Sequence, residues 1–282
     1  MARRAPLVRK LIGRRVEVEH GVRDLRGCDR IAVLAQWSRS AGMTRSVCTL
    51  VAGLQHHGYH VVVSSSCEAT RPLGWSDDVD RARLTVLRKP NIGYDFGSWS
   101  TALRFLPEIA SAPRVLLVND SMAGPFVPLT AVLSKFDDTE ADAWGLTDTR
   151  QFGHHLQSYF FGFCDGALRD LSLASFWSDV RHHTDKMTII FENEIALGTL
   201  LREEGYACEA AFPYELVVQS GYNPVILGWN GLLERGFPFI KREILRDPEV
   251  APLGMSAPRV IQRRFGVDLA EWVDDPILAA AR

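Results

Sequence analysis

RVLLVNDSMAGPF, residues 114–126, is the stretch on which the predicted fold rests. Its apolar run, Val115–Val118, has no polar alternation, which is typical of a central strand covered on both faces in a parallel sheet. A polar triplet follows before Gly124 and Pro125 turn the chain into a loop, namely Asn119, Asp120 and Ser121. Ligands of open α/β sheets bind beyond the carboxyl ends of the strands, so we expect Asp120 near a phosphate or a phosphate-bound cation. An ordinary strand-ending turn is the alternative that the stretch alone leaves open.

Strand and helix patterns alternate on both sides of this stretch. Strands are predicted at residues 30–35, 60–64, 83–87, 142–147, 154–163 and 206–212. Helices are predicted at residues 47–57, 127–136, 168–180 and 191–205. Strand–helix–strand repeats of these lengths predict an α/β fold, a Rossmann-type, mostly parallel sheet with helices on both faces.

Composition narrows the class of protein. With 282 residues, 46% of them hydrophobic, the chain is long enough for one large domain with a substantial core. The net charge of −2 argues against nucleic acid as the main partner. Five cysteines without Cys-x-x-Cys spacing indicate free thiols rather than a disulfide framework or a zinc site. No apolar run reaches the roughly 18 residues of a membrane span and no signal-peptide core is present, so we expect a cytoplasmic location.

Three regions are predicted along the chain: a basic leader at 1–29, the main domain at 30–246 and a C-terminal extension at 247–282. In the leader, arginine and lysine are interleaved with apolar residues. Such a pattern permits either a basic amphipathic turn on the inner face of an anionic membrane or a solvated, frayed segment. The extension is rich in proline and carries no functional signal.

Residues 88–99, RKPNIGYDFGSW, form the most unusual loop. Gly93 and Gly97 bracket Asp95, an arrangement that lets backbone approach a ligand closely. Asn91 and Asp95 supply an amide and a carboxylate from the same loop. The alternative is an Asn/Gly turn in which Asp95 caps the following helix.

Residues 191–205, FENEIALGTLLREEG, contain a second candidate carboxylate. Glu194 precedes an apolar stripe formed by Leu197, Leu200 and Leu201, so it is predicted to point inward from the first turn of a helix. There the helix dipole favours the ionised carboxylate. Simple electrostatic capping of the helix is the competing interpretation.

Further polar residues are predicted to contact an acceptor or a phosphate. Asp148 ends the strand at 142–147, and His155, Gln157 and Ser158 lie in the aromatic segment 154–163. Adjacent histidines point in different directions in regular structure, so the three His-His pairs of the chain are not expected to bind metal. Residues 236–246, GFPFIKREILR, add cations that either neutralise a diphosphate or are solvated, namely Lys241, Arg242 and Arg246.

Taken together, these segments resemble the rhamnan synthesis protein F family of bacterial polysaccharide glycosyltransferases. The resemblance runs from about residue 30 to residue 246, with the motifs in the expected order. It implies a GT-A-like nucleotide-sugar fold, a single domain plus the C-terminal extension. It also implies transfer of a deoxysugar, typically rhamnose from dTDP-rhamnose, onto a growing cell-surface glycan.

The resemblance assigns roles to individual residues. Asn91, Gly93, Asp95 and Gly97 resemble the donor-side loop, to which Asn119 and Ser121 also belong. Asp120 stands where many GT-A enzymes have Asp-x-Asp, which makes it the metal and catalytic candidate. Because the second carboxylate of that motif is missing, Mg²⁺ or Mn²⁺ is possible but not demanded. Glu194 takes the place of the catalytic base of inverting enzymes, with Glu192 as its rival.

Two classes of function remain open at this stage. The leading one is an inverting glycosyltransferase with a lipid-linked or growing glycan as acceptor, in peripheral contact with the membrane. The alternative is a catalytically silent partner that binds a glycan or a nucleotide sugar in a polysaccharide assembly complex. A nucleotide-sugar hydrolase is a third and weaker reading.

Overall fold

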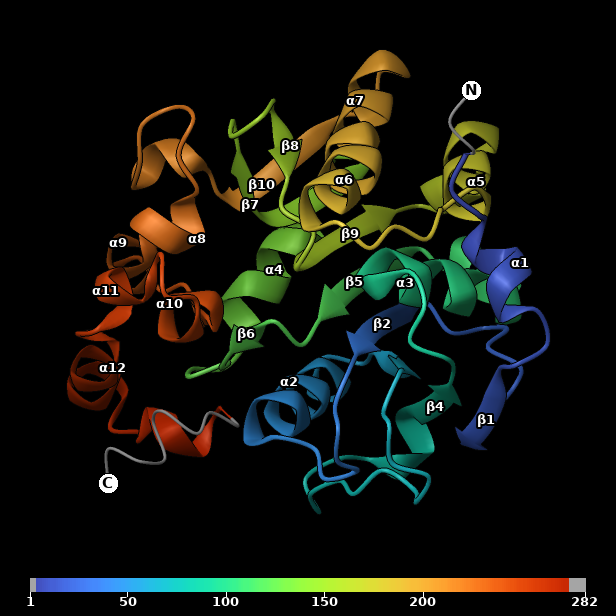
Figure 1. Cartoon of the computed structure of the whole chain (residues 1–282), viewed down its shortest axis with the longest axis horizontal. Helices are drawn as coiled ribbons and strands as arrows, with labels where there is room; N and C mark the ends of the chain where they lie inside the picture. Colours follow the sequence, from blue (N-terminus) through green and yellow to red (C-terminus); the bar gives the residue numbers. More distant parts are fainter. Residues whose placement is uncertain (1–3, 274–282) are drawn as a thin grey trace.

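A nine-stranded, mostly parallel sheet forms the centre of the protein (Figure 1). The structure is a computed structural model that describes residues 4–273. Along the sheet the strands run in the order β1 (Glu17–His20), β4 (Leu84–Arg88), β3 (His60–Ser65), β2 (Arg30–Gln36), β5 (Arg114–Asn119), β9 (Phe160–Cys164), β7 (Ala143–Thr149) and β10 (Cys208–Phe212). The short strand β8 (His155–Leu156) pairs with β7.

The pairing confirms the predicted α/β class. Strands β4, β3, β2 and β5 are parallel to one another, and β7 is parallel to β10. Strands β1, β8 and β9 are antiparallel. The predicted strand at 154–163 is divided into β8 and β9, because the chain turns back from β7 through a hairpin and then enters the sheet between β5 and β7.

Helices cover both faces of the sheet, as predicted. One face carries α2 (Arg45–His56) and α4 (Thr130–Asp138), and the other carries α1 (Val8–Ile12), α3 (Tyr94–Phe105), α5 (Leu171–Ser178) and α7 (Ala196–Glu203). In β5, Leu116 and Val118 pack on the first face and Val115 and Leu117 on the second. The apolar run without polar alternation is therefore buried on both sides.

The order of the parallel strands reverses between β2 and β5. The indole N–H of Trp99, on α3, lies 3.2 Å from the carbonyl oxygen of Val33 in β2 and 3.0 Å from that of Val118 in β5. This buried side chain fixes α3 across the two strands at the position where doubly wound sheets open a ligand crevice.

The segment before residue 30 differs from the predicted leader. Its described part packs into the sheet: β1 pairs with β4, and Val8, Ile12 and Leu25 are each at most 2% exposed. Val8 and Ile12, two of the apolar residues that would have faced a membrane, are thus part of the core beside α3. Within residues 4–273, no helix has the length and hydropathy needed to cross a bilayer.

The C-terminal part also packs against the domain. Strands β6 (Met122–Ala123) and β11 (Ile240–Lys241) form a small antiparallel pair. A third apolar cluster joins that pair to the helices drawn in orange and red in Figure 1, namely α8 (Pro224–Leu227), α9 (Trp229–Glu234), α10 (Glu243–Arg246) and α12 (Ala257–Phe265). α11 (Ala251–Gly254) packs between them. Residue 247 is therefore no structural boundary; the rest of the predicted extension, 274–282, lies outside the described residues.

We expect Ile12→Ala to lower the free energy of unfolding by about 2–5 kcal/mol, because it opens a cavity under α3. The exposed Arg14 lies two residues away, and Arg14→Ala should change stability by less than about 0.5 kcal/mol. Urea unfolding of both variants measures the difference. Equal stabilities would restore the interpretation of this segment as a solvated leader.

Candidate active site

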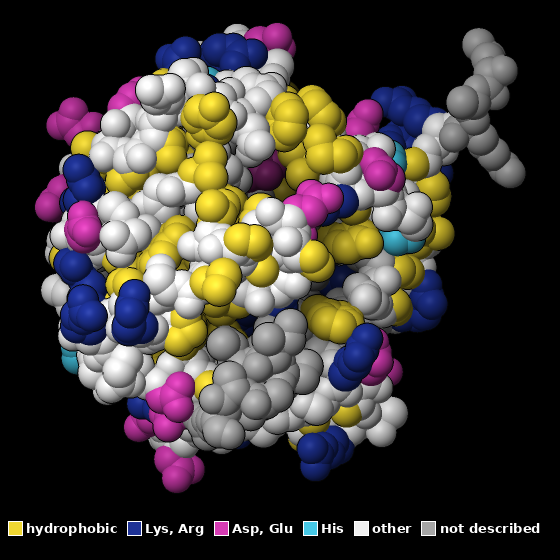
Figure 2. All heavy atoms as spheres, turned by 60° about the vertical axis from the view of Figure 1, so that its left-hand side comes forward, with side chains coloured by type: hydrophobic (Ala, Val, Ile, Leu, Met, Phe, Trp, Pro, Cys, Tyr) yellow, Lys and Arg dark blue, Asp and Glu magenta, His cyan; other side chains and the backbone are white. Residues whose placement is uncertain are grey.

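A cavity of about 680 Å³ opens beyond the carboxyl ends of β5 and β7. Its size suits a small-molecule ligand. Figure 2 shows hydrophobic side chains around a hollow that contains an acidic side chain. Eight of the residues predicted from the sequence line it, namely Asp95, Asn119, Ser121, His155, Gln157, Ser158, Glu194 and Lys241, whereas Asp120 is outside the lining.

Asn119, the last residue of β5, organises the wall of this cavity between β5 and α3. Its side-chain N–H donates to Asp95 Oδ2 over 2.8 Å. Its side-chain oxygen accepts from the backbone N–H of Ser121 at 3.1 Å and from the Ser121 hydroxyl at 2.6 Å. The amide thus links β5 to the first turn of α3 and shapes the polar turn that follows β5.

Asp120 points to the neighbouring strand. Its Oδ2 accepts a hydrogen bond of 3.0 Å from the backbone N–H of Trp37, which directly follows β2. Burial raises the pKa of Asp120, opposed by the Trp37 N–H and by the positive charges of Arg242 and Arg246. Two of the three predicted cations therefore act on this carboxylate.

Asp95 supplies a second carboxylate beside Asp120. Burial and the charge of Asp120 together raise the pKa of Asp95 to about 7, against the Asn119 hydrogen bond and the charge of Lys89. Lys89 is itself buried, which lowers its pKa to about 8. The acid that the sequence motif lacks after β5 is thus provided by the first turn of α3.

The two carboxylates fit a divalent cation only in part. Within residues 4–273, no three Asp, Glu, His or Cys side chains converge in a way that would hold a metal ion. One or two carboxylates are enough for Mg²⁺ when substrate phosphates complete its coordination. Their mutual repulsion, seen in the raised pKa of Asp95, is what a bound cation would relieve.

The glycines of the predicted donor loop have a structural role. A Cβ on Gly93 would lie 2.6 Å from Val8 Cγ2, and one on Gly97 would lie 2.5 Å from the Ile92 carbonyl oxygen. Both therefore allow α1 and the loop to pack against α3, and the expectation that they bring backbone close to a ligand is corrected. Asn91 is exposed and does not line the cavity.

Glu194 lines the opposite wall, but not from a helix N-terminus. The helix begins at Lys186 with α6 (Lys186–Ile189), widens into a π-helical turn at Ile190–Ile195 and continues as α7. The dipole argument for Glu194 is thus wrong, because eight residues of helix precede it. Its Oε1 instead accepts a hydrogen bond of 2.7 Å from the Ser158 N–H. The rival Glu192 is exposed and outside the cavity lining.

Of the predicted acceptor contacts, Gln157 is buried at the cavity wall, where its Oε1 accepts from Thr147 and its Nε2 donates to Asn223. Asp148 does not line the cavity. Both of its carboxylate oxygens are engaged, one by His154 at 2.8 Å and the other by the Tyr214 N–H at 2.8 Å. Asp148 therefore fixes the β7 end rather than a ligand.

Lys241 lies at the cavity rim beside Ser121 because β11 pairs with β6. Its ammonium is 3.1 Å from Glu243 Oε2, and Glu243 Oε1 is 2.7 Å from Lys186 at the start of α6. The three side chains form a charged bridge between the helix of Glu194 and the C-terminal helices.

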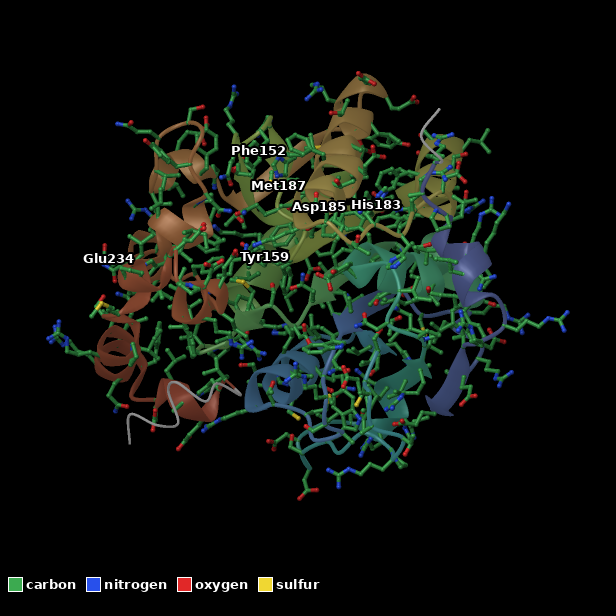
Figure 3. All side chains as sticks on the ribbon, in the orientation of Figure 1. Phe152, Tyr159, His183, Asp185, Met187 and Glu234 are labelled. Carbon is green, nitrogen blue, oxygen red and sulfur yellow. The ribbon has the colours of Figure 1, made fainter. Side chains whose placement is uncertain are left out.

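An apolar rim surrounds the mouth of the cavity and was not predicted. Its side chains are each 41–53% exposed, namely Tyr94, Phe152, Met187, Tyr222, Leu227 and Leu253. Figure 3 shows Phe152 and Met187 near each other, on the β7–β8 hairpin and on α6. Tyr94 and Phe152 both have positive φ, at 52° and 63°, a strained conformation that no periodic sequence pattern reveals.

Comparison with known proteins agrees with this architecture. The model of the family described as "Rhamnan synthesis protein F" matches residues 76–270. The chain belongs to the rhamnan synthesis protein F family. The match extends past residue 246, in line with the packing of the C-terminal helices. Membership associates the chain with polysaccharide synthesis.

The individual relatives of the chain have low sequence identity to it. "Virulence protein VirA" of Vibrio anguillarum is 30% identical over 202 residues, which cover 60% of this chain and 65% of the relative. "Uncharacterized protein y4gN" of Sinorhizobium fredii is 27% identical over 154 residues, 51% of this chain and 40% of the relative. The chain thus spans just under two thirds of VirA's length.

We expect Asp95→Asn to stabilise the protein increasingly as the pH rises. The native pKa of about 7 exceeds the ordinary value of 3.8, so native Asp95 holds its proton more tightly than the unfolded chain does. Stability is therefore lost between pH 3.8 and 7 as the pH rises, and the uncharged amide escapes that loss. The stability difference between variant and wild type should widen by about 2 kcal/mol from pH 5 to pH 8. Urea unfolding at both pH values measures it, and a pH-independent difference would contradict the buried, repelled carboxylate.

Proposed function

We propose that this protein is an inverting glycosyltransferase of polysaccharide synthesis. The observation that carries the proposal is a single cavity with a carboxylate on each of two walls, Asp95 on one side and Glu194 on the other. Asp120 lies outside the lining, near enough for its charge to raise the pKa of Asp95. Glu194 is close enough for its charge to raise the pKa of Asp95. An inverting transfer needs this arrangement, since the leaving diphosphate and the attacking hydroxyl lie on opposite faces of the sugar.

The donor is a nucleotide sugar, with dTDP-rhamnose as the first candidate because of the family. Its diphosphate would lie at the turn after β5, near the Ser121 hydroxyl and the cations Lys241 and Arg242. Asp120 and Asp95 would hold Mg²⁺ or Mn²⁺ there, and the cation would stabilise the charge of the leaving diphosphate.

Glu194 is the proposed base. Its Oε1 is oriented by the Ser158 N–H, and the carboxylate lines the cavity opposite the donor side. It takes the proton of the acceptor hydroxyl while that oxygen attacks the anomeric carbon and the diphosphate departs with the bonding electrons. The acceptor, a lipid-linked or growing glycan, would enter through the apolar rim, past Gln157 and His155.

Turnover assays with a panel of dTDP-, UDP- and GDP-sugars, with and without a glycan acceptor, test this proposal. Transfer that requires acceptor supports it, and release of free sugar without acceptor favours a hydrolase. Nucleotide-sugar binding, seen as a raised melting temperature, without any turnover favours the catalytically silent partner. If no member of the panel is bound or turned over, both the enzyme role and the binding role are contradicted.

Glu194→Gln should lower kcat by about 10²- to 10⁴-fold and leave donor affinity close to wild type, because a general base acts mainly in the transition state. Glu192→Gln is the matched control: this neighbouring carboxylate is exposed and should change kcat little. Steady-state kinetics and donor titration of both variants provide the measurement. A larger loss in Glu192→Gln would move the base to that residue.

Asp120→Asn should weaken donor binding and reduce the stimulation of activity by Mn²⁺ or Mg²⁺, since it removes one of two neighbouring carboxylates. The amide oxygen still accepts the Trp37 hydrogen bond, so the fold should persist. Titration of the nucleotide diphosphate at several cation concentrations checks this. Unchanged affinity and unchanged cation response would leave Asp120 as a turn residue only.

A further inference from the structure

A buried histidine lies behind Glu194. His155 is 7% exposed, and its Nε2 lies 3.9 Å from Glu194 Oε1. Both side chains line the same cavity. The separation exceeds a hydrogen bond by about 1 Å, which is common for catalytic pairs before substrate binds.

The other ring nitrogen fixes which protons the imidazole carries. His155 Nδ1 lies 2.8 Å from the carbonyl oxygen of Gly153, which can only accept a hydrogen bond. Nδ1 therefore carries the proton. In the neutral ring, Nε2 is then unprotonated and presents its lone pair to Glu194. His155 Nε2 and the Glu194 carboxylate are then two hydrogen-bond acceptors that face each other. A proton delivered to either of them can be shared between the two.

The local backbone is built around this contact. The β7–β8 hairpin turns through positive φ at Phe152 and Gly153, which places the Gly153 carbonyl under the ring. A Cβ on Gly198 of α7 would lie 2.5 Å from His155 Cβ, so only glycine lets the hairpin approach the helix this closely. Glu194 itself lies in the π-helical turn, a rare conformation that is frequent at functional sites.

Contacts within the protein occupy only part of the hydrogen-bonding capacity of the Glu194 carboxylate. Among the described residues, the Ser158 N–H provides the one hydrogen bond to its side chain. The carboxylate is therefore oriented on one side and remains able to accept the acceptor's proton and to meet His155 on the other.

We propose that His155 is the second member of the base, the group that receives the proton from Glu194. This inference deepens the proposed function and rests on it. The acceptor O–H bond breaks and its proton goes to the Glu194 carboxylate, while the acceptor oxygen forms the bond to the anomeric carbon. The bond from that carbon to the diphosphate breaks, and its electron pair leaves with the diphosphate.

Glu194 then gives the proton to His155 Nε2, directly or through one water, and returns to the carboxylate. The imidazolium keeps its Nδ1–H bond to Gly153 and releases the extra proton to water as the product departs. In total, one proton passes from the acceptor to solvent, and no oxidant or co-reactant is needed.

His155→Asn separates this role from a structural one. The asparagine amide takes the place of Nδ1 and keeps the bond to Gly153, but it presents nothing to Glu194. We expect kcat to fall roughly 10- to 100-fold with donor affinity unchanged, less than for loss of the base itself. His154→Asn is the matched control, because its ring is half exposed, pairs with Asp148 and does not line the cavity.

The double variant Glu194→Gln, His155→Asn decides whether the two act as a unit. Without Glu194 there is no proton to receive, so His155→Asn should cost less than about twofold in the Glu194→Gln background. A structural role would give the same loss in both backgrounds. Additive losses therefore overturn the relay.

A second measurement needs no substrate. The ring ¹⁵N shifts of His155 in the wild-type protein should report the Nδ1–H tautomer above neutral pH, and the signal is assigned by its absence in His155→Asn. The Nε2–H tautomer would overturn the relay while leaving the glycosyltransferase proposal intact. Absence of turnover with every donor would instead overturn the proposed function, and the relay with it.

Discussion

Asn119 donates a hydrogen bond to Asp95, and the cavity wall between β5 and α3 depends on that contact. A buried carboxylate is costly unless donors surround it, and this amide is the nearest one. A carboxylate at position 119 would instead place a further negative charge at hydrogen-bond distance from Asp95, with Asp120 next to it. The amide at the end of β5 therefore donates a hydrogen bond to the acid at the start of α3 without adding negative charge beside Asp120.

The opposite wall is organised by backbone geometry rather than by charge. The hairpin after β7 lies against α7 at Gly198, and Ser158 meets Glu194 through its N–H. The charged bridge from Lys186 through Glu243 to Lys241 then connects this wall to the C-terminal helices. The bridge lies at the rim where the two walls meet.

The fold was largely readable from the sequence because it depends on local patterns. The apolar run 115–118 specifies burial on both faces, and the spacing of apolar residues in α2 specifies one buried helix face. The predictions that failed concern contacts between segments that are far apart in the sequence. The space that a side chain of residue 93 would need is filled by Val8, which lies 85 positions earlier in the sequence. The local sequence around Gly93 does not show this contact, so the prediction assigned that space to a ligand. The start of the Glu194 helix was missed because its first residues, 186–188, show no apolar stripe, although Asp185 caps them. The apolar rim was not predicted for the same reason, since its residues come from α3, the β7–β8 hairpin, α6, the segment before α8, α8 and α11.

The pairing of β6 with β11 has a consequence for the order in which the molecule matures. Every strand of the large sheet has been synthesised by residue 212, whereas β11 begins at residue 240 and Trp272 packs on Phe126 still later. A nascent chain that folds from its N-terminus can thus complete its scaffold before Lys241 and Arg242 have left the ribosome. The cationic edge of the cavity then forms as a separate, final step of biogenesis, set by the position of a two-residue strand.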